Sequence, residues 1–157
     1  MDIALAVEYI LPAASYMGSV TANTNEAWEL VIWTDTRREK PTWKEIEEAE
    51  KERMLETVIE EYKAKIQNRL DTFAQTREYG GILSACTRAT SAIDMLRVDG
   101  QYCVDAQDNT WIKAYTVLQE MRQYVATGGT IPEWEVIESL LPPLAWPEGS
   151  DEYADKC

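Results

Sequence analysis

The stretch from Thr42 to Arg77, TWKEIEEAEKERMLETVIEEYKAKIQNRLDTFAQTR, decides the fold because it contains neither glycine nor proline. It predicts a single helix of about 54 Å at about 1.5 Å per residue. Thr42 and Glu45 have the spacing of a capping box directly after Pro41, which marks the start of the helix. Gly80-Gly81 predicts its end, since glycine readily takes the left-handed conformation that closes a helix.

Apolar residues divide this helix into two parts. The first third, Trp43 to Arg53, offers only Trp43, Ile46 and Ala49 among eight charged residues, so we expect it to be solvated or to face a partner. From Met54 onward apolar residues recur at helical spacing and predict one buried face. They are Met54, Leu55, Val58, Ile59, Tyr62, Ile66, Leu70 and Phe73. This spacing leaves two alternatives open, a self-associating coiled coil and a seam buried within one chain.

Strands are expected on one side of this helix and further helices on the other. Three strands are expected before the helix, followed by the charged linker Thr36 to Pro41. The strands are Ala4 to Leu11, Ser15 to Ala22 and Ala27 to Asp35. After the helix we expect a short helix, a long helical stretch with a break near Asp99-Gly100, a stop, a last short helix and an extended apolar strap. Their ranges are Ile82 to Ala89, Thr90 to Ala126, Thr127 to Gly129, Glu133 to Leu140 and Leu141 to Pro147.

These expectations give a mainly α fold class with a small N-terminal β element, a long central helix and a C-terminal helical bundle. The predicted domains are residues 1–36, a small β-rich docking element, and residues 37–79, the linker and long helix. Residues 80–147 form the C-terminal helical domain, and residues 148–157 an acidic flexible tail. A two- or three-stranded sheet is marginal alone, so we expect the β element to pack on the long helix or on a partner.

Composition narrows the partners. The chain has 157 residues, 45% of them hydrophobic, and a formal charge of −13 with no histidine. Nucleic acid is a poor partner, because binding phosphates needs clustered Lys and Arg. No apolar run approaches the roughly 18 residues of a membrane span. Three sparse cysteines, Cys86, Cys103 and Cys157, in a chain that begins without a basic region or cleavage site, predict free thiols in a reducing compartment.

No constellation of residues indicates catalysis. Without histidine the chain lacks the usual base for a nucleophile and the commonest transition-metal ligand. The neighbouring acids Glu47-Glu48 and Glu60-Glu61 point about 100° apart on a helix and do not converge. Asp105 and Asp108 would need further ligands to hold a cation. We therefore expect no catalytic residue, no cofactor and no metal.

The aromatic residues are the strongest indication of an interaction surface. Large aromatic side chains supply burial in cores and anchors at interfaces. We expect Trp111 in the core. Trp33, Trp43 and Ile46, near the charged end of the long helix, and Trp146, between prolines of the strap, are the candidate partner-binding residues.

The segment RLDTFAQTREYGGILSACTRATSAIDMLRVDGQYCVDAQDNTWIKAYTVLQEM, together with the closing IPEWEVIESLLPPLAWP, resembles a segment found at the C-terminus of tail-module proteins of tailed bacteriophages. The matching positions are Leu70, Asp71, Ala74, Arg77, Tyr79, Ile82, Ser84, Ala85, Ala89, Asp99, Gly100, Gln101, Asp108, Trp111, Tyr115, Leu141, Pro142, Leu144, Trp146 and Pro147. The front segment TANTNEAWELVIWTDTRREKPTWKEIEEA is similar to the "W-x-D-x-R" and "P-T-x-x-E-I" arrangement of phage tail-fibre assembly chaperones.

The resemblance implies a tail-fibre or baseplate-associated protein that docks to other proteins, either an assembly chaperone or a small structural subunit of the virion tail. Its expected partner is a tail-fibre or baseplate protein, with a homo-oligomer as a further possibility. The expected location is the host cytoplasm during assembly, or the virion tail. The alternative, from the charge of −13, is an acidic inhibitor or regulator that binds a basic host protein.

Overall fold

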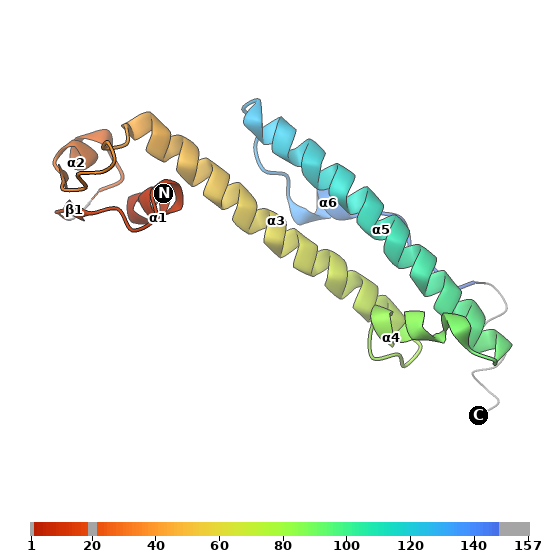
Figure 1. Cartoon of the computed structure of the whole chain (residues 1–157). Coiled ribbons are helices and arrows are strands. Elements are labelled where there is room, and N and C mark those ends of the chain that lie inside the picture. The colour runs from red at the N-terminus through yellow and green to blue at the C-terminus, as the bar shows by residue number, and fades with distance from the viewer. Residues whose placement is uncertain (1, 19–21, 148–157) are drawn as a thin grey trace. The chain divides into compact units, whose positions relative to one another are not determined.

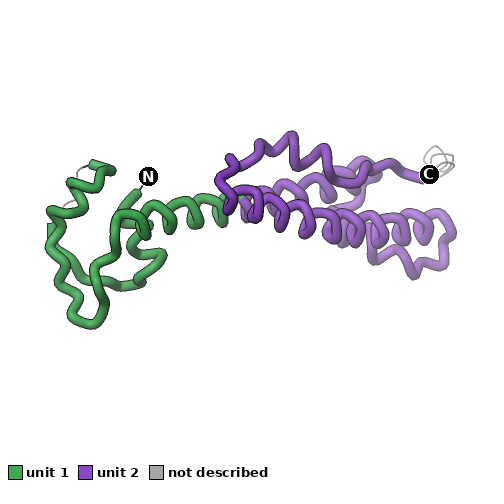
Figure 2. Tube along the Cα trace, turned by 90° about the horizontal axis from the view of Figure 1, so that it is seen from above, with its two compact units in different colours: residues 1–58 green, residues 59–157 purple. Residues whose placement is uncertain are grey.

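The computed structural model describes residues 2–18 and 22–147 and is mainly helical (Figure 1). The elements in chain order are α1 (Ile3–Ile10), β1 (Tyr16–Met17), α2 (Asn25–Glu29), β2 (Ile32–Trp33), α3 (Trp43–Gln75), α4 (Ile82–Cys86), the 3-10 helix η1 (Thr87–Thr90), α5 (Asp94–Ala126) and α6 (Trp134–Ser139). The predicted fold class is confirmed. The chain forms two compact units, Met1–Val58 and Ile59–Cys157, that divide within α3 (Figure 2). The predicted tail, residues 148–157, lies outside the described residues.

Helix α3 begins as the sequence predicts. The backbone N–H of Glu45 donates to Thr42 Oγ1 at 3.3 Å, and Glu45 Oε2 accepts from the Thr42 N–H at 2.7 Å. These hydrogen bonds satisfy donors that a helix start leaves unpaired, and they hold the pKa of Glu45 below its ordinary value. The capping box and the long helix are therefore both confirmed.

The first third of α3 was predicted to be solvated or to face a partner, and for its apolar face this prediction is wrong. Ile46 and Ala49 are buried in the core of unit 1. The other buried members of this core come from α1, from α2 and from the segment between α2 and β2; they are Ile3, Ala6, Val7, Trp28 and Val31. The reason is that the N-terminal elements of unit 1 pack on this face of α3, so that only the charged face stays exposed.

One of the three predicted strands is wrong, and the other two are shorter than predicted. Residues 4–11 lie mostly in α1, whose buried residues Ile3, Ala6 and Val7 follow the helical period, and Asp2 caps it by accepting from the Leu5 N–H at 3.1 Å. Residues 27–35 begin in α2, capped by Thr24, before the two-residue strand β2. In the range 15–22 only β1 is a strand, and residues 19–21 lie outside the described residues. The capping residues Asp2 and Thr24 are helix-start signals that the sequence contains.

A lysine side chain closes α2. The ammonium of Lys40 donates to the carbonyl oxygens of Trp28, Glu29 and Val31 at 2.9, 3.3 and 2.9 Å. Its Nζ atom also lies 4.9 Å from the centre of the Trp28 ring. A positive charge at a helix C-terminus satisfies orphan carbonyls and opposes the helix dipole. This contact fastens the predicted linker to the core of unit 1.

The end of α3 differs from the prediction. The helix stops at Gln75, and the residue with a left-handed backbone is Glu78, at φ 63°, rather than either glycine. Gly81 instead makes room for a side chain: a Cβ there would lie 2.7 Å from Asp71 Oδ1. That oxygen accepts from the Ile82 N–H at 2.8 Å and so caps α4 from the last turns of α3.

In unit 2, α5 and the C-terminal part of α3 run antiparallel (Figure 1), and their shared core contains Leu70, Ala74 and Cys103 together with Ile82 and Ala85 of α4. The predicted break near Asp99-Gly100 is wrong, because α5 runs through it without interruption. The glycine is needed for close approach: a Cβ on Gly100 would lie 2.1 Å from the Ala89 nitrogen. The predicted start at Thr90-Ser91 also moves, to Asp94.

The closing elements follow the prediction more closely. Helix α5 ends at Ala126, and Gly128 takes φ 96° as a left-handed stop. The N–H groups of Gly128 and Gly129 donate to the carbonyls of Val125 and Tyr124, both at 3.0 Å, which is the Schellman arrangement. Helix α6 and the strap, residues 141–147, then return along unit 2.

Candidate functional site

The four predicted partner-binding residues are mostly occupied by contacts within the chain. Ile46 is fully buried, so its side chain presents no surface. Trp43 is half-buried and packs on the core of unit 1. Trp33 is half-buried, donates from Nε1 to the Arg38 carbonyl at 2.7 Å and stacks on Tyr16 with ring centres 6.2 Å apart. Ile46 is therefore a core residue of unit 1, and contact of the four residues with a partner stays a prediction.

Trp146 anchors the strap to unit 2. Its ring stacks on Phe73 with centres 4.3 Å apart, and its Nε1 donates to Thr76 Oγ1 at 2.8 Å. The guanidinium of Arg77 lies over the Trp146 ring, 4.4 Å from the ring centre. The strap is also held by the Ala145 N–H, which donates to the Tyr102 hydroxyl at 3.0 Å. Trp146 thus contributes to the packing of its own chain.

An apolar patch lies instead on the outer face of the two-stranded ladder. Met17 and Ile32 are directly opposed in the antiparallel register, and each side chain is 63% exposed. Leu30, two residues before Ile32, is 82% exposed. Opposed residues on one face have Cβ atoms about 5 Å apart, so Met17 and Ile32 form one continuous surface. We call Met17, Leu30 and Ile32 the ladder patch.

Sequence reasoning missed the ladder patch because the phase of the strand pattern was wrong. A strand over residues 27–35 would place Trp28, Leu30 and Ile32 on one face, because side chains alternate along a strand. In the structure the α2 helix rotates the chain between Trp28 and Ile32, so that Trp28, Val31 and Trp33 pack inward while Leu30 and Ile32 face out. The N-cap pattern at Thr24 was the signal that could have revealed this change of period.

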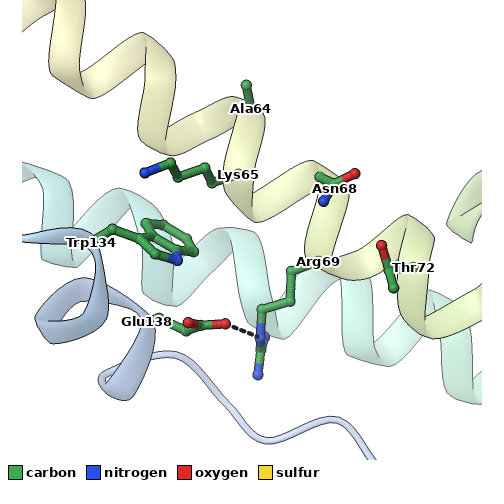
Figure 3. Close-up of a pocket in the computed structure, with 7 residues that line it drawn as sticks. All are labelled: Ala64, Lys65, Asn68, Arg69, Thr72, Trp134 and Glu138. Carbon is green, nitrogen blue, oxygen red and sulfur yellow. Dashed lines mark ion pairs between the residues drawn. The ribbon is translucent and has the colours of Figure 1, made fainter.

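A groove lies on unit 2 between α3 and α6 (Figure 3). Its volume is about 600 Å³, and it is open to solvent; its lining residues are Ala64, Lys65, Asn68, Arg69, Thr72, Trp134 and Glu138. We call it the α3–α6 groove. Lys65 Nζ lies 5.5 Å from the ring centres of both Tyr62 and Trp134. The groove therefore combines cations with an aromatic wall.

Arg69 is the most constrained residue of the groove. Its Nη2 donates to the Pro142 carbonyl at 2.8 Å, and its Nε faces Glu138 Oε1 across 3.7 Å. The Nη1 atom is buried without a hydrogen-bond partner among the described residues. A guanidinium N–H without an acceptor costs free energy, so Arg69 retains a buried, unsatisfied donor.

A buried polar cluster holds the far end of α3 to α5. The Arg77 guanidinium pairs with Asp99, whose carboxylate also accepts from the Tyr79 hydroxyl at 3.2 Å. Burial, and then the negative charge of Asp99, raise the pKa of Tyr79. Buried polar groups are stable when they are hydrogen-bonded, so this cluster ties the segment after α3 to the first turns of α5.

The described cysteines are free thiols, as predicted. Cys103 is fully buried, and burial raises its pKa to about 12, which keeps it a thiol at neutral pH. Burial also raises the pKa of Cys86, whose Sγ contacts Gln107 Oε1 at 3.4 Å. Cys157 lies outside the described residues. Both described cysteines therefore act as packing residues.

Within residues 2–18 and 22–147, no three side chains of the His, Cys, Asp and Glu types gather as a metal site. Over the same ranges, none of the helices combines the length and the apolar character needed to cross a bilayer. A scan against models of protein families, a search of curated protein sequences and a search of solved structures each found no match.

Proposed function

We propose that this chain works by docking to another protein, as a bacteriophage tail-fibre or baseplate-associated protein. The observation that carries the docking role is the ladder patch, because Met17 and Ile32 oppose each other as exposed apolar side chains and Leu30, close by in sequence, is exposed as well. The phage assignment comes from the sequence resemblance. A two-stranded ladder also has two edges, and a sheet edge is a place where a strand from a partner can pair.

The residues that carry the resemblance support treating it as a shared fold module. Asp71 caps α4, Arg77 and Tyr79 bind Asp99, and Gly100 lets η1 approach α5. A motif whose spacing meets several structural needs at once is harder to acquire by chance than one that meets a single need. The module itself holds unit 2 together and leaves the docking surface to unit 1.

The docking test is co-expression of the chain with the neighbouring fibre gene, followed by sizing of the complex. Ile32→Glu places a charge on the ladder patch and should abolish or strongly weaken co-elution. Ile112→Glu is the matched control, because Ile112 is 67% exposed on α5 in unit 2 and should leave the complex intact. Circular dichroism of both variants checks folding. Equal behaviour of the two variants contradicts docking through the ladder patch.

A second measurement distinguishes the two proposed roles, structural subunit and assembly chaperone. Mass spectrometry of purified particles detects a structural subunit at a fixed copy number, whereas an assembly chaperone leaves before the particle is complete. Both results are compatible with docking. Presence at a fixed copy number excludes a purely transient chaperone, and absence excludes a structural subunit.

The alternative function is an acidic inhibitor or regulator of a basic host protein. It is favoured by a second groove on unit 1, of about 510 Å³, lined by four glutamates. They are Glu39, Glu45, Glu48 and Glu52. A pull-down from host lysate distinguishes the two functions. Recovery of a basic, nucleic-acid-binding protein that is lost in a Glu48→Gln, Glu52→Gln variant, with no fibre protein recovered, would replace the first proposal by the second.

A further inference from the structure

The strap, residues 141–147, is held on unit 2 in the manner of a bound peptide. It contains three prolines, and residues 142–147 belong to no helix or strand. The Leu141 N–H donates to the Glu138 carbonyl at 3.1 Å, and this is the last backbone-to-backbone hydrogen bond that residues 141–146 make within the described part of the chain. The contacts that hold residues 142–146 come instead from side chains of unit 2.

Two of these side chains bind the backbone of the strap. Arg69 Nη2 donates to the Pro142 carbonyl at 2.8 Å, and the Tyr102 hydroxyl accepts from the Ala145 N–H at 3.0 Å. Proline fixes its own backbone torsion and favours an extended conformation in the residue before it, so such a segment loses little entropy on binding. Docking of an extended, proline-rich segment against aromatic side chains is a recurring mode of peptide recognition.

Trp146 is the anchor of the strap. Its ring stacks on Phe73 with centres 4.3 Å apart, and its centre lies 5.8 Å from the Tyr102 ring and 6.3 Å from the Tyr79 ring. The Arg77 guanidinium lies 4.4 Å from the same ring centre. We call Phe73, Arg77, Tyr79 and Tyr102 the strap site. Three aromatic rings and a cation around one indole are the surroundings of an interface anchor.

The core of unit 2 forms without the strap beyond Leu141. The buried residues of the core around Leu70 lie on α3, α4 and α5, whereas residues 142–146 are half-buried or exposed. A segment with few buried contacts opens at a lower free energy than the core on which it packs. The strap can therefore leave the strap site while the rest of unit 2 stays folded.

We propose that the strap site recognises an extended segment of the docking partner in which prolines flank a tryptophan, and that the strap is the chain's own competing ligand. This inference rests on the proposed docking function and gives it a second contact, distinct from the ladder patch. The attached strap and a segment of a partner that is already docked both act at effective concentrations of millimolar order. One can therefore replace the other.

The test is a nuclear magnetic resonance titration of the full chain carrying Trp146→Ala with acetyl-Leu-Pro-Pro-Leu-Ala-Trp-Pro-amide. The indole nitrogen of the peptide is isotope-labelled, so that only the peptide gives the signal. We expect saturable binding with a roughly millimolar dissociation constant. The indole signal should move as its N–H donates to Thr76 Oγ1. Wild-type protein should bind at least about tenfold more weakly, because its own strap occupies the site.

Three controls isolate the strap site. Trp134→Ala removes another half-buried tryptophan of unit 2, leaves the strap in place and should bind no better than wild type. Thr76→Val, added to Trp146→Ala, removes the hydrogen-bond acceptor and should weaken binding about three- to tenfold. Acetyl-Leu-Ala-Ala-Leu-Ala-Trp-Ala-amide keeps the indole without the preset backbone and should bind at least about threefold more weakly.

Ala145→Pro is a second variant that loosens the strap. It removes only the N–H that donates to Tyr102, leaves the strap site unchanged and should give an affinity between those of wild type and Trp146→Ala. Circular dichroism of each variant checks folding.

Equal binding by Trp134→Ala and Trp146→Ala, or by wild type and Trp146→Ala, would overturn the proposal. So would equal binding of the two peptides, or no saturation up to about 10 mM peptide with either loosened variant.

Failure of this inference is distinguishable from failure of the proposed function. Phe73→Ala removes the ring on which the tryptophan stacks. A co-expressed fibre complex that persists unchanged in this variant leaves docking standing and removes the strap site from it. Peptide binding without any fibre complex would retain the strap site for proline-rich segments and exclude the fibre as its partner.

Discussion

Gly100 offers the sharpest test of the packing of unit 2. It lies inside α5, where replacement by alanine normally stabilises a helix by about 1 kcal/mol. Here a Cβ would lie 2.1 Å from the Ala89 nitrogen and 2.4 Å from the Arg88 carbonyl carbon. Both atoms belong to the backbone of η1 and cannot rotate away, so η1 and α5 must separate. We therefore expect Gly100→Ala to destabilise the protein, against the helix propensity.

The magnitude follows from these opposing effects. Overpacking a tight contact costs about 1–3 kcal/mol, and a clash with backbone belongs at the upper end of that range. Subtracting the helix-propensity gain of about 1 kcal/mol leaves a net loss of about 2 kcal/mol. For a unit of this size, such a loss lowers the midpoint of thermal unfolding by about 8–16 °C.

The assay is thermal unfolding by circular dichroism, combined with amide hydrogen exchange along α5. Gly128→Ala is the control, because it is strained only through its φ of 96° and meets no atom within 4 Å. It should cost about 1 kcal/mol, the penalty of a left-handed backbone, and leave exchange in the middle of α5 unchanged. A Gly100→Ala protein as stable as the wild type would refute the close approach of η1 to α5.

Three further predictions concern single contacts. Lys40→Met should destabilise unit 1 by about 1.5–3 kcal/mol, because three carbonyls lose their charged donor. Lys44→Met, at an exposed site, is the control and should hardly change the free energy of unfolding measured by chemical denaturation. Trp146→Ala should cost about 2 kcal/mol and accelerate hydrogen exchange in the strap, since its ring is only half-buried. The hydrogen bond from Arg53 holds the pKa of Glu50 below its ordinary 4.5. The stability of unit 1 should therefore stay constant from neutral pH to about pH 4.5 and decrease at lower pH. In acid unfolding curves, Arg53→Gln should make this decrease smaller.

Local chemistry explains which elements could be predicted. The capping box at Thr42, the absence of glycine and proline through α3, and the glycine stop at Gly128 each act within a few residues, so the sequence alone contains the necessary information. The buried face of α3 from Ile59 to Leu70 was also predictable, because a long amphipathic pattern specifies its own period. These residues are buried within unit 2 of one chain, while self-association stays a prediction.

Contacts distant in sequence explain what could not be predicted. The residues next to Gly100 in sequence do not reveal that η1 packs against it. From the sequence alone, a glycine that permits close approach therefore cannot be told from one that interrupts a helix. Ile46 looked exposed because its neighbours in sequence are charged, yet it is covered by α1, about 40 residues earlier. The same limit applies to the α3–α6 groove, whose two walls are about 65 residues apart in the chain. An interaction surface depends on which residues the fold leaves uncovered.

The three hydrogen bonds of the Lys40 ammonium also give unit 1 a built-in chemical reporter. A reagent that acylates amines can attack this nitrogen only after it leaves the carbonyls, whereas the ammonium of Lys44 stays accessible throughout. The ratio of modification at the two lysines, read by peptide mass mapping, therefore measures how often the N-terminal unit opens. Partner binding that secures this unit would be visible as selective protection of a single amine.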